Sequence, residues 1–99
     1  MARVPMVIAV RRNSHGDVVK VLRGIVDTAT NFWIDGGEPA PMPVIKIVDS
    51  LMAGEAVWSR LPNGAPGPTL RVVLAKAGHG IETVELDDAT LTVADLAQF

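Results

Sequence analysis

The sequence lacks cysteine and tyrosine, and aromatic residues make up only 4% of its 99 positions. Without cysteine, the chain forms no disulfide and offers no thiolate for catalysis or metal binding. Long hydrophobic runs are also missing, because the apolar segment at residues 6–10 is too short for a signal-peptide core or a membrane span. We therefore expect a cytoplasmic protein that has no membrane partner.

Motifs with a defined chemistry are absent as well. No phosphate-binding loop, dinucleotide fingerprint or nucleophile elbow occurs, and no residues show the spacing of a metal site. The acidic stretch E-T-V-E-L-D-D at residues 82–88 lacks the spacing of a calcium loop and is typical of a solvated strand face. We therefore expect no cofactor and no metal.

The chain is rich in aliphatic residues, with a hydrophobic fraction of 48% and a mean hydropathy of +0.31. Its length predicts a single domain over residues 1–99 with a modest core. A domain of this size has much surface for its volume, so some apolar side chains should stay exposed in the monomer. We expect the chain to bind itself, as a homodimer or higher oligomer, and binding to another protein is an alternative.

One segment, residues 43–54, has the period of an amphipathic helix. Its apolar residues share one stripe, namely Val44, Ile47, Val48, Leu51 and Met52. Pro43 suits the first helical turn, and Gly54 suits the left-handed position just after the helix. The rest of the chain offers no second helix of this length, so the strands should form a sheet that covers this one.

Two pairs of β-rich runs predict hairpins. Residues 6–12 and 18–23 flank the turn N-S-H-G-D, in which Gly16 can take a positive φ, and residues 69–76 and 81–86 flank A-G-H-G. Strict alternation would place Met6, Ile8 and Val10 on one face of the first strand. Residues 55–61 predict a further strand after the helix, and T-V-A-D at residues 92–95 predicts a capped helical turn that buries Val93, Leu96 and Phe99.

Two segments rich in proline and glycine connect these elements. The segment at residues 36–43 contains Pro39, Pro41 and Pro43, and we expect an extended connector without ladder hydrogen bonds. The stretch L-P-N-G-A-P-G-P predicts an exposed, mobile loop at residues 62–68. The fold class that follows is α+β, with one helix packed on a mainly antiparallel sheet of about five strands in the order ββ-α-β-ββ.

The two histidines, His15 and His79, both lie in predicted turns beside a glycine. Imidazole titrates near neutral pH, and Asp17 could orient His15. The three side chains would form a catalytic or metal-binding group only if the two hairpin tips converge. Ser14 is a poor nucleophile here, since a triad needs the nucleophile held within hydrogen-bond reach of its base.

Charge is unevenly distributed along the chain, although the net charge is only −2. Residues 1–26 contain five basic residues and one acid, whereas residues 77–99 contain five acids and no base. The two ends could lie side by side or meet across a dimer interface. Alternatively, the basic residues could form a surface for nucleic acid. Their small number and the lack of aromatic residues among them argue against this alternative. The five residues are Arg3, Arg11, Arg12, Lys20 and Arg23.

Two tryptophans account for half of the aromatic residues. Trp58 follows the helix on a predicted strand, so we expect it in the core. The segment Phe32, Trp33 and Ile34 predicts a short strand closed by Asp35-Gly36-Gly37. Because tryptophan is enriched at interface hot spots, this segment is our candidate for binding a partner.

Three stretches carry a resemblance: V-I-A-V-R-R-N-S-H-G-D-V-V-K-V-L, P-V-I-K-I-V-D-S-L-M-A-G and L-D-D-A-T-L-T-V-A-D-L-A-Q-F. They resemble a family of short bacterial proteins of unknown function. That family opens with an I-x-x-V-R-x-x-x-G-x-I hairpin, continues with a helix ending in glycine and a second hairpin, and closes with L-x-x-L-P-x-F. Here the final proline is missing, and the insertions at residues 38–43 and 62–68 depart from the pattern. The resemblance implies a fold and no activity.

The leading interpretation is a non-catalytic binding or assembly module that self-associates through a sheet face or edge. A small enzyme or metal-binding protein using His15, His79 and Asp17 is the first alternative. A nucleic-acid accessory protein using the basic first hairpin is the second.

Overall fold

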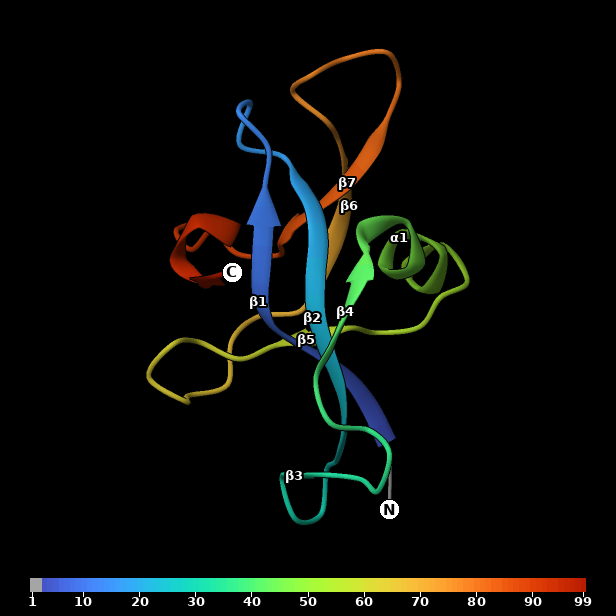
Figure 1. The fold of residues 1–99 in the computed structure, drawn as a ribbon, viewed down its shortest axis with the longest axis vertical. Coiled ribbons are helices and arrows are strands. Elements are labelled where there is room, and N and C mark those ends of the chain that lie inside the picture. Colours follow the sequence, from blue (N-terminus) through green and yellow to red (C-terminus); the bar gives the residue numbers. More distant parts are fainter. Residues whose placement is uncertain (1–2) are drawn as a thin grey trace.

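The fold is organised around a long antiparallel hairpin formed by β1 (Arg3–Arg12) and β2 (Val18–Asp27). A computed structural model describes residues 3–99, and over this range the chain forms eight strands and one α-helix (Figure 1). Six strands belong to one sheet and the other two to a second sheet. An α+β architecture is therefore confirmed, whereas a single sheet of about five strands is wrong.

Two irregularities in the first hairpin change which side chains face the core. The register between β1 and β2 shifts between Val7 and Ala9 and again between Arg11 and Arg12. Each bulge inserts one extra residue and so reverses the alternation beyond it. Val7 and Val10 consequently both lie in the core, and the expected grouping of Met6, Ile8 and Val10 on one face is wrong.

The open side of β2 carries two short strands, β3 (Phe32–Trp33) and β4 (Ala40–Pro43). The expectation that the proline-rich connector makes no ladder is wrong, because β4 pairs with β2 from Lys20 to Arg23. Pro41 and Pro43 are two residues apart on β4, so their backbone nitrogens lie on the same side of the strand. This side, which lacks N–H groups, faces away from β2. An edge strand tolerates proline at such positions.

The helix α1 (Val44–Met52) ends as the sequence predicts. Gly54 has a φ of 87°, and its N–H donates to the Leu51 carbonyl while the Glu55 N–H donates to the Ser50 carbonyl, both at 3.0 Å. This pair of bonds closes a Schellman motif. Pro43, however, is the N-cap residue with an extended backbone rather than part of the first turn.

The second hairpin, β6 (Leu70–Leu74) and β7 (Glu82–Leu86), forms its own sheet and packs with α1 against the first hairpin. In Figure 1 it lies behind β1 and β2. The Thr83 hydroxyl is buried and donates to the Val18 carbonyl at 2.7 Å, which joins the two hairpins. One core results, built from both hairpins, α1, the residue before β5 and the C-terminal turn: Val7, Val10, Val18, Val21, Ile47, Val48, Val57, Leu70, Val84, Leu86, Val93 and Leu96.

Two short parallel strands complete the large sheet along β1: β5 (Trp58–Ser59) and β8 (Ala97–Gln98). The strand expected at residues 55–61 is therefore reduced to two residues. Before β8, the 3₁₀ turn η1 (Val93–Asp95) begins with the predicted capping box at Thr92 and buries Val93. The proline-rich loop at residues 62–68 is closed by hydrogen bonds, including Gly67 N–H to the Ser59 carbonyl at 2.9 Å.

Candidate functional surfaces

The turns of the two hairpins meet through Asp17. Its carboxylate oxygens accept the backbone N–H of Lys76 at 2.7 Å and that of Ala77 at 2.9 Å. The Asn13 side-chain oxygen in turn accepts the backbone N–H groups of His15 and Asp17. Both oxygens of Asp17 thus bind backbone donors of the second turn, so this side chain holds the two turns together.

The electrostatics of Asp17 follow from this geometry. The Lys76 N–H is the main cause that lowers the pKa of Asp17 below 3.8, and partial desolvation opposes it. The Ala77 N–H, the Asn13 side chain and the charge of His15 lower this pKa further. The ionised carboxylate therefore stabilises the contact between the turns.

The two histidines and Asp17 do not gather into one metal-binding group within residues 3–99. His15 is exposed in the first turn, and His79 is exposed in the second with a φ of 65°. Over residues 3–99, no three histidine or carboxylate side chains lie close enough together to hold a metal ion. The tips of the two hairpins do lie together, but their contact joins the Asp17 carboxylate to the backbone N–H groups of Lys76 and Ala77.

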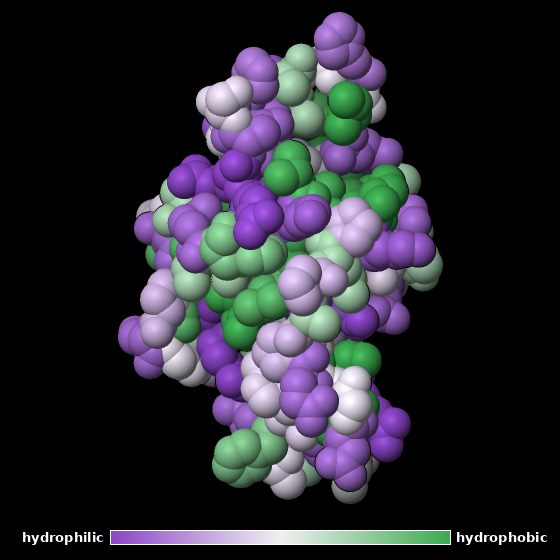
Figure 2. Space-filling view, in the orientation of Figure 1, coloured by the Kyte–Doolittle hydropathy of each residue, from purple (hydrophilic) through white to green (hydrophobic). Residues whose placement is uncertain are grey.

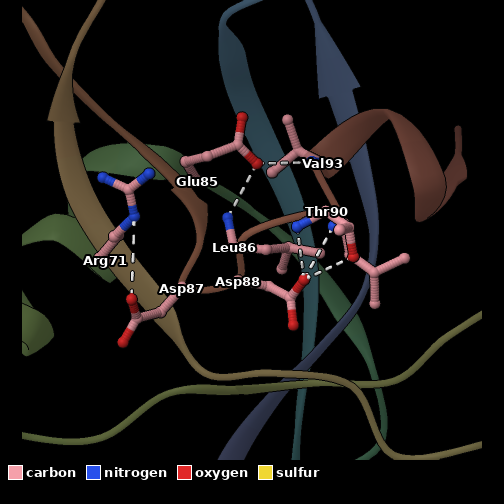
Figure 3. Close-up of polar contacts among 8 residues, drawn as sticks. Arg71, Glu85, Leu86, Asp87, Asp88, Thr90 and Val93 are labelled. Carbon is pink, nitrogen blue, oxygen red and sulfur yellow. Dashed lines mark hydrogen bonds and ion pairs between the residues drawn. The ribbon is translucent and has the colours of Figure 1, made fainter.

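Two carboxylates of the acidic stretch at residues 82–88 accept hydrogen bonds from the backbone (Figure 3). Glu85 accepts the backbone N–H of Leu86 at 2.8 Å and that of Val93 at 2.6 Å. Asp88 accepts from the backbone N–H groups of Leu91 and Thr90, which lower the pKa of Asp88 below 3.8. The interpretation of residues 82–88 as a merely solvated face is therefore wrong for these two carboxylates, which anchor the chain before and within η1.

The predicted partner segment is only partly available for binding. Phe32 has 74% of its surface exposed at the end of the molecule, where β3 lies. Trp33 instead packs over Gly24, and the Arg60 guanidinium lies 5.0 Å from the centre of its ring. Ile34 packs against Gly37. Two of the three side chains thus serve the fold.

Trp58 corrects another expectation. It is 41% exposed, whereas the preceding Val57 is completely buried in the core. Adjacent residues of an extended segment point to opposite sides, so only one of them could enter the core. The exposed indole lines an apolar hollow of about 310 Å³ together with Val4, Met6 and Val26.

The basic residues are divided between surfaces. Arg11 lies opposite Lys20 across the first hairpin, while Arg23, three residues further along β2, lies on the other face beside α1. Within residues 3–99 the only ion pair is Arg71 with Asp87, both exposed and 4.0 Å apart. The basic hairpin and the acidic C-terminal residues therefore do not neutralise each other within the described chain.

An apolar depression lies where the hairpin tips meet the start of α1. We call it the tip groove. It has a volume of about 220 Å³, and its walls include Val19, Val44, Ala75 and Ile81. Ile81 is 56% exposed, and the exposed Leu74 pairs across the hairpin with Glu82, which also lines the groove. Figure 2 shows hydrophobic residues between the tip of the second hairpin and α1, surrounded by hydrophilic ones.

Comparisons with known proteins give no further assignment. No family model matches the chain, and neither the curated proteins nor the solved structures yield a significant match. The resemblance to short bacterial proteins stays a prediction. Over residues 3–99, no helix is long and apolar enough to cross a bilayer.

Proposed function

We propose that this protein is a non-catalytic binding module that self-associates through the tip groove. The observation that carries the proposal is the exposure of large apolar side chains that line this groove, namely Val19 and Ile81. Apolar surface of this kind on a small domain is stabilised when another chain covers it.

A sheet face supports association better than the β4 edge does. Pro41 and Pro43 occupy the open side of β4, where they present no N–H groups to an incoming strand. Natural proteins use prolines in this way to block pairing between sheet edges. A second copy would therefore dock by covering apolar side chains and not by extending this edge.

Charge favours a second copy as the occupant. Lys20 and Arg11 of the first hairpin form no ion pair within residues 3–99, and Glu82 beside the tip groove forms none either. A two-fold contact could bring the basic hairpin of one copy toward the acidic second hairpin of the other. Such pairing predicts that raising the salt concentration weakens the dimer.

The test is solution mass measured by light scattering after size exclusion. Wild type should be a dimer at low micromolar concentration, and Ile81→Lys should be a monomer because it places a charge in the apolar contact. Phe32→Ser is the matched control, since it removes an even more exposed apolar side chain far from the tip groove. It should leave the dimer intact.

Two outcomes would contradict the proposal. A wild type that stays monomeric at low micromolar concentration would contradict self-association as its function. A dimer that survives Ile81→Lys but dissociates in Phe32→Ser would move the interface to the aromatic segment. Amide spectra of both variants would confirm that each retains the native fold.

A further inference from the structure

A further hollow, on the face of the sheet that α1 packs against, combines positive charge with an apolar wall. We call it the Arg23 hollow. It has a volume of about 350 Å³ and lies between β2, β4 and α1. Its lining consists of Arg23, Met42, Pro43, Lys46, Ile47 and Ser50. This volume is at the lower end of the range of small-molecule sites.

Arg23 enters the hollow from the middle of the sheet. It lies on β2 between Val7 of β1 and Ala40 of β4, two residues after the buried Val21 and so on the same face. Its Nε–H is buried and has no hydrogen-bond partner. A buried donor without an acceptor is rare in native proteins and calls for a specific explanation, such as a bound ion or ligand.

Lys46 adds a second positive charge to the same hollow. It is the third residue of α1, and the first turn contains no acidic residue and no side-chain cap. A cation near a helix N-terminus opposes the helix dipole. Within residues 3–99, neither Lys46 nor Arg23 forms an ion pair, so their mutual repulsion is not offset by a carboxylate.

The remaining polar group restricts the chemistry of the ligand. The Ser50 hydroxyl donates to the Lys46 carbonyl at 3.1 Å, so its proton is already used. The donors left for a ligand are the Arg23 guanidinium and the Lys46 ammonium, both of which match oxyanions. Met42, Pro43 and Ile47 provide an apolar wall beside them.

We propose that the Arg23 hollow binds the oxyanion of a small molecule, a phosphate or a carboxylate. The terminal N–H groups of Arg23 bind two anionic oxygens, and Lys46 contributes its charge from the helix. The apolar wall accommodates a short carbon skeleton attached to the anion. This inference is independent of self-association through the tip groove, which involves other residues.

The experiment follows the Arg23 Nε–H signal by ¹H–¹⁵N NMR during titration with inorganic phosphate and, separately, with acetate. Ionic strength is held constant with sodium chloride. A saturable shift of the Arg23 signal is expected for at least one anion. Lys46→Gln should weaken this binding about fivefold, as the loss of a partly exposed charge contact does. Lys76→Gln, at the tip of the second hairpin, should leave the affinity within about twofold, since distant surface charges are screened.

The comparison between the two anions identifies which oxyanion fits, and saturation by either one supports the proposal. A shift that never saturates, or one that Lys76→Gln weakens as much as Lys46→Gln, would show general screening and overturn it. A shift of the Arg23 signal that depends on protein concentration without added anion would assign the hollow to a carboxylate of a second copy. That result would overturn the small-molecule site while leaving self-association intact.

Discussion

One buried hydroxyl joins the two hairpins away from their turns, and its removal gives a sharp test of the fold. Thr83 has 4% of its surface exposed, and its hydroxyl donates to the Val18 carbonyl at 2.7 Å across 65 residues of sequence. Thr83→Val keeps the shape of the side chain and the β-branching that suits β7. It replaces the donor with a methyl group.

The magnitude follows from two opposing contributions. Leaving the buried Val18 carbonyl without this donor costs about 1–3 kcal/mol, and the added methyl group recovers at most about 0.8 kcal/mol by its burial. With the full recovery subtracted, we therefore expect Thr83→Val to lower the free energy of unfolding by about 0.2–2 kcal/mol, with about 1 kcal/mol as the central value. For a domain of this size, each kcal/mol lowers Tm by about 4–8 °C.

Urea denaturation followed by tryptophan fluorescence measures the effect. The midpoint should fall while the m-value stays unchanged, because the same surface is exposed on unfolding. Thr30→Val is the matched control, since Thr30 is exposed in the turn before β3, and it should change stability by less than about 0.5 kcal/mol. If Thr83→Val were as stable as this control, the hydroxyl would not join the hairpins energetically, and the reasoning would be refuted.

The elements that the sequence predicts correctly are those whose signals are local. Gly54 and Gly16 adopt the positive φ values that a helix end and a tight turn require, 87° and 85° respectively. The stripe on α1 is set by its own spacing, and Ile47 and Val48 are buried accordingly, whereas Met52 at the end of the predicted stripe is 68% exposed. Thr92 begins η1 because its capping box lies within four consecutive residues.

Other features depend on partners distant in sequence. The bulge near Ile8 is defined only by pairing with β2, so alternation alone cannot show that Val7 and Val10 share the core. β8 consists of two residues, and it becomes a strand because β1 offers it an edge. Parallel pairing of this kind leaves no turn signal in the sequence.

The candidate sites show the same limit. The spacing of two residues predicts that Asp17 orients His15, but the oxygens of Asp17 bind the backbone N–H groups of Lys76 and Ala77. Backbone donors carry no residue signature, so the sequence could not reveal them. The sequence does not distinguish Arg23 from the other basic residues, and only the folded structure shows that its Nε–H is buried and unpaired in the hollow beside α1.

Two further predictions concern close contacts and pH. Gly24→Ala should destabilise the protein by about 1–3 kcal/mol, because a Cβ there would lie 2.5 Å from the Trp33 ring, and Trp33→Leu in the same background should recover part of the loss in urea denaturation. Asp17→Asn should lower the urea midpoint at neutral pH, because an amide offers only one acceptor oxygen to two N–H donors. Since the folded state lowers the pKa of Asp17, its stabilisation is present above 3.8 and is lost as pH falls through the lower, folded value. The difference between wild type and Asp17→Asn should therefore shrink in acid, whereas a difference that stays constant down to low pH would show that the ionised carboxylate does not hold the two turns together.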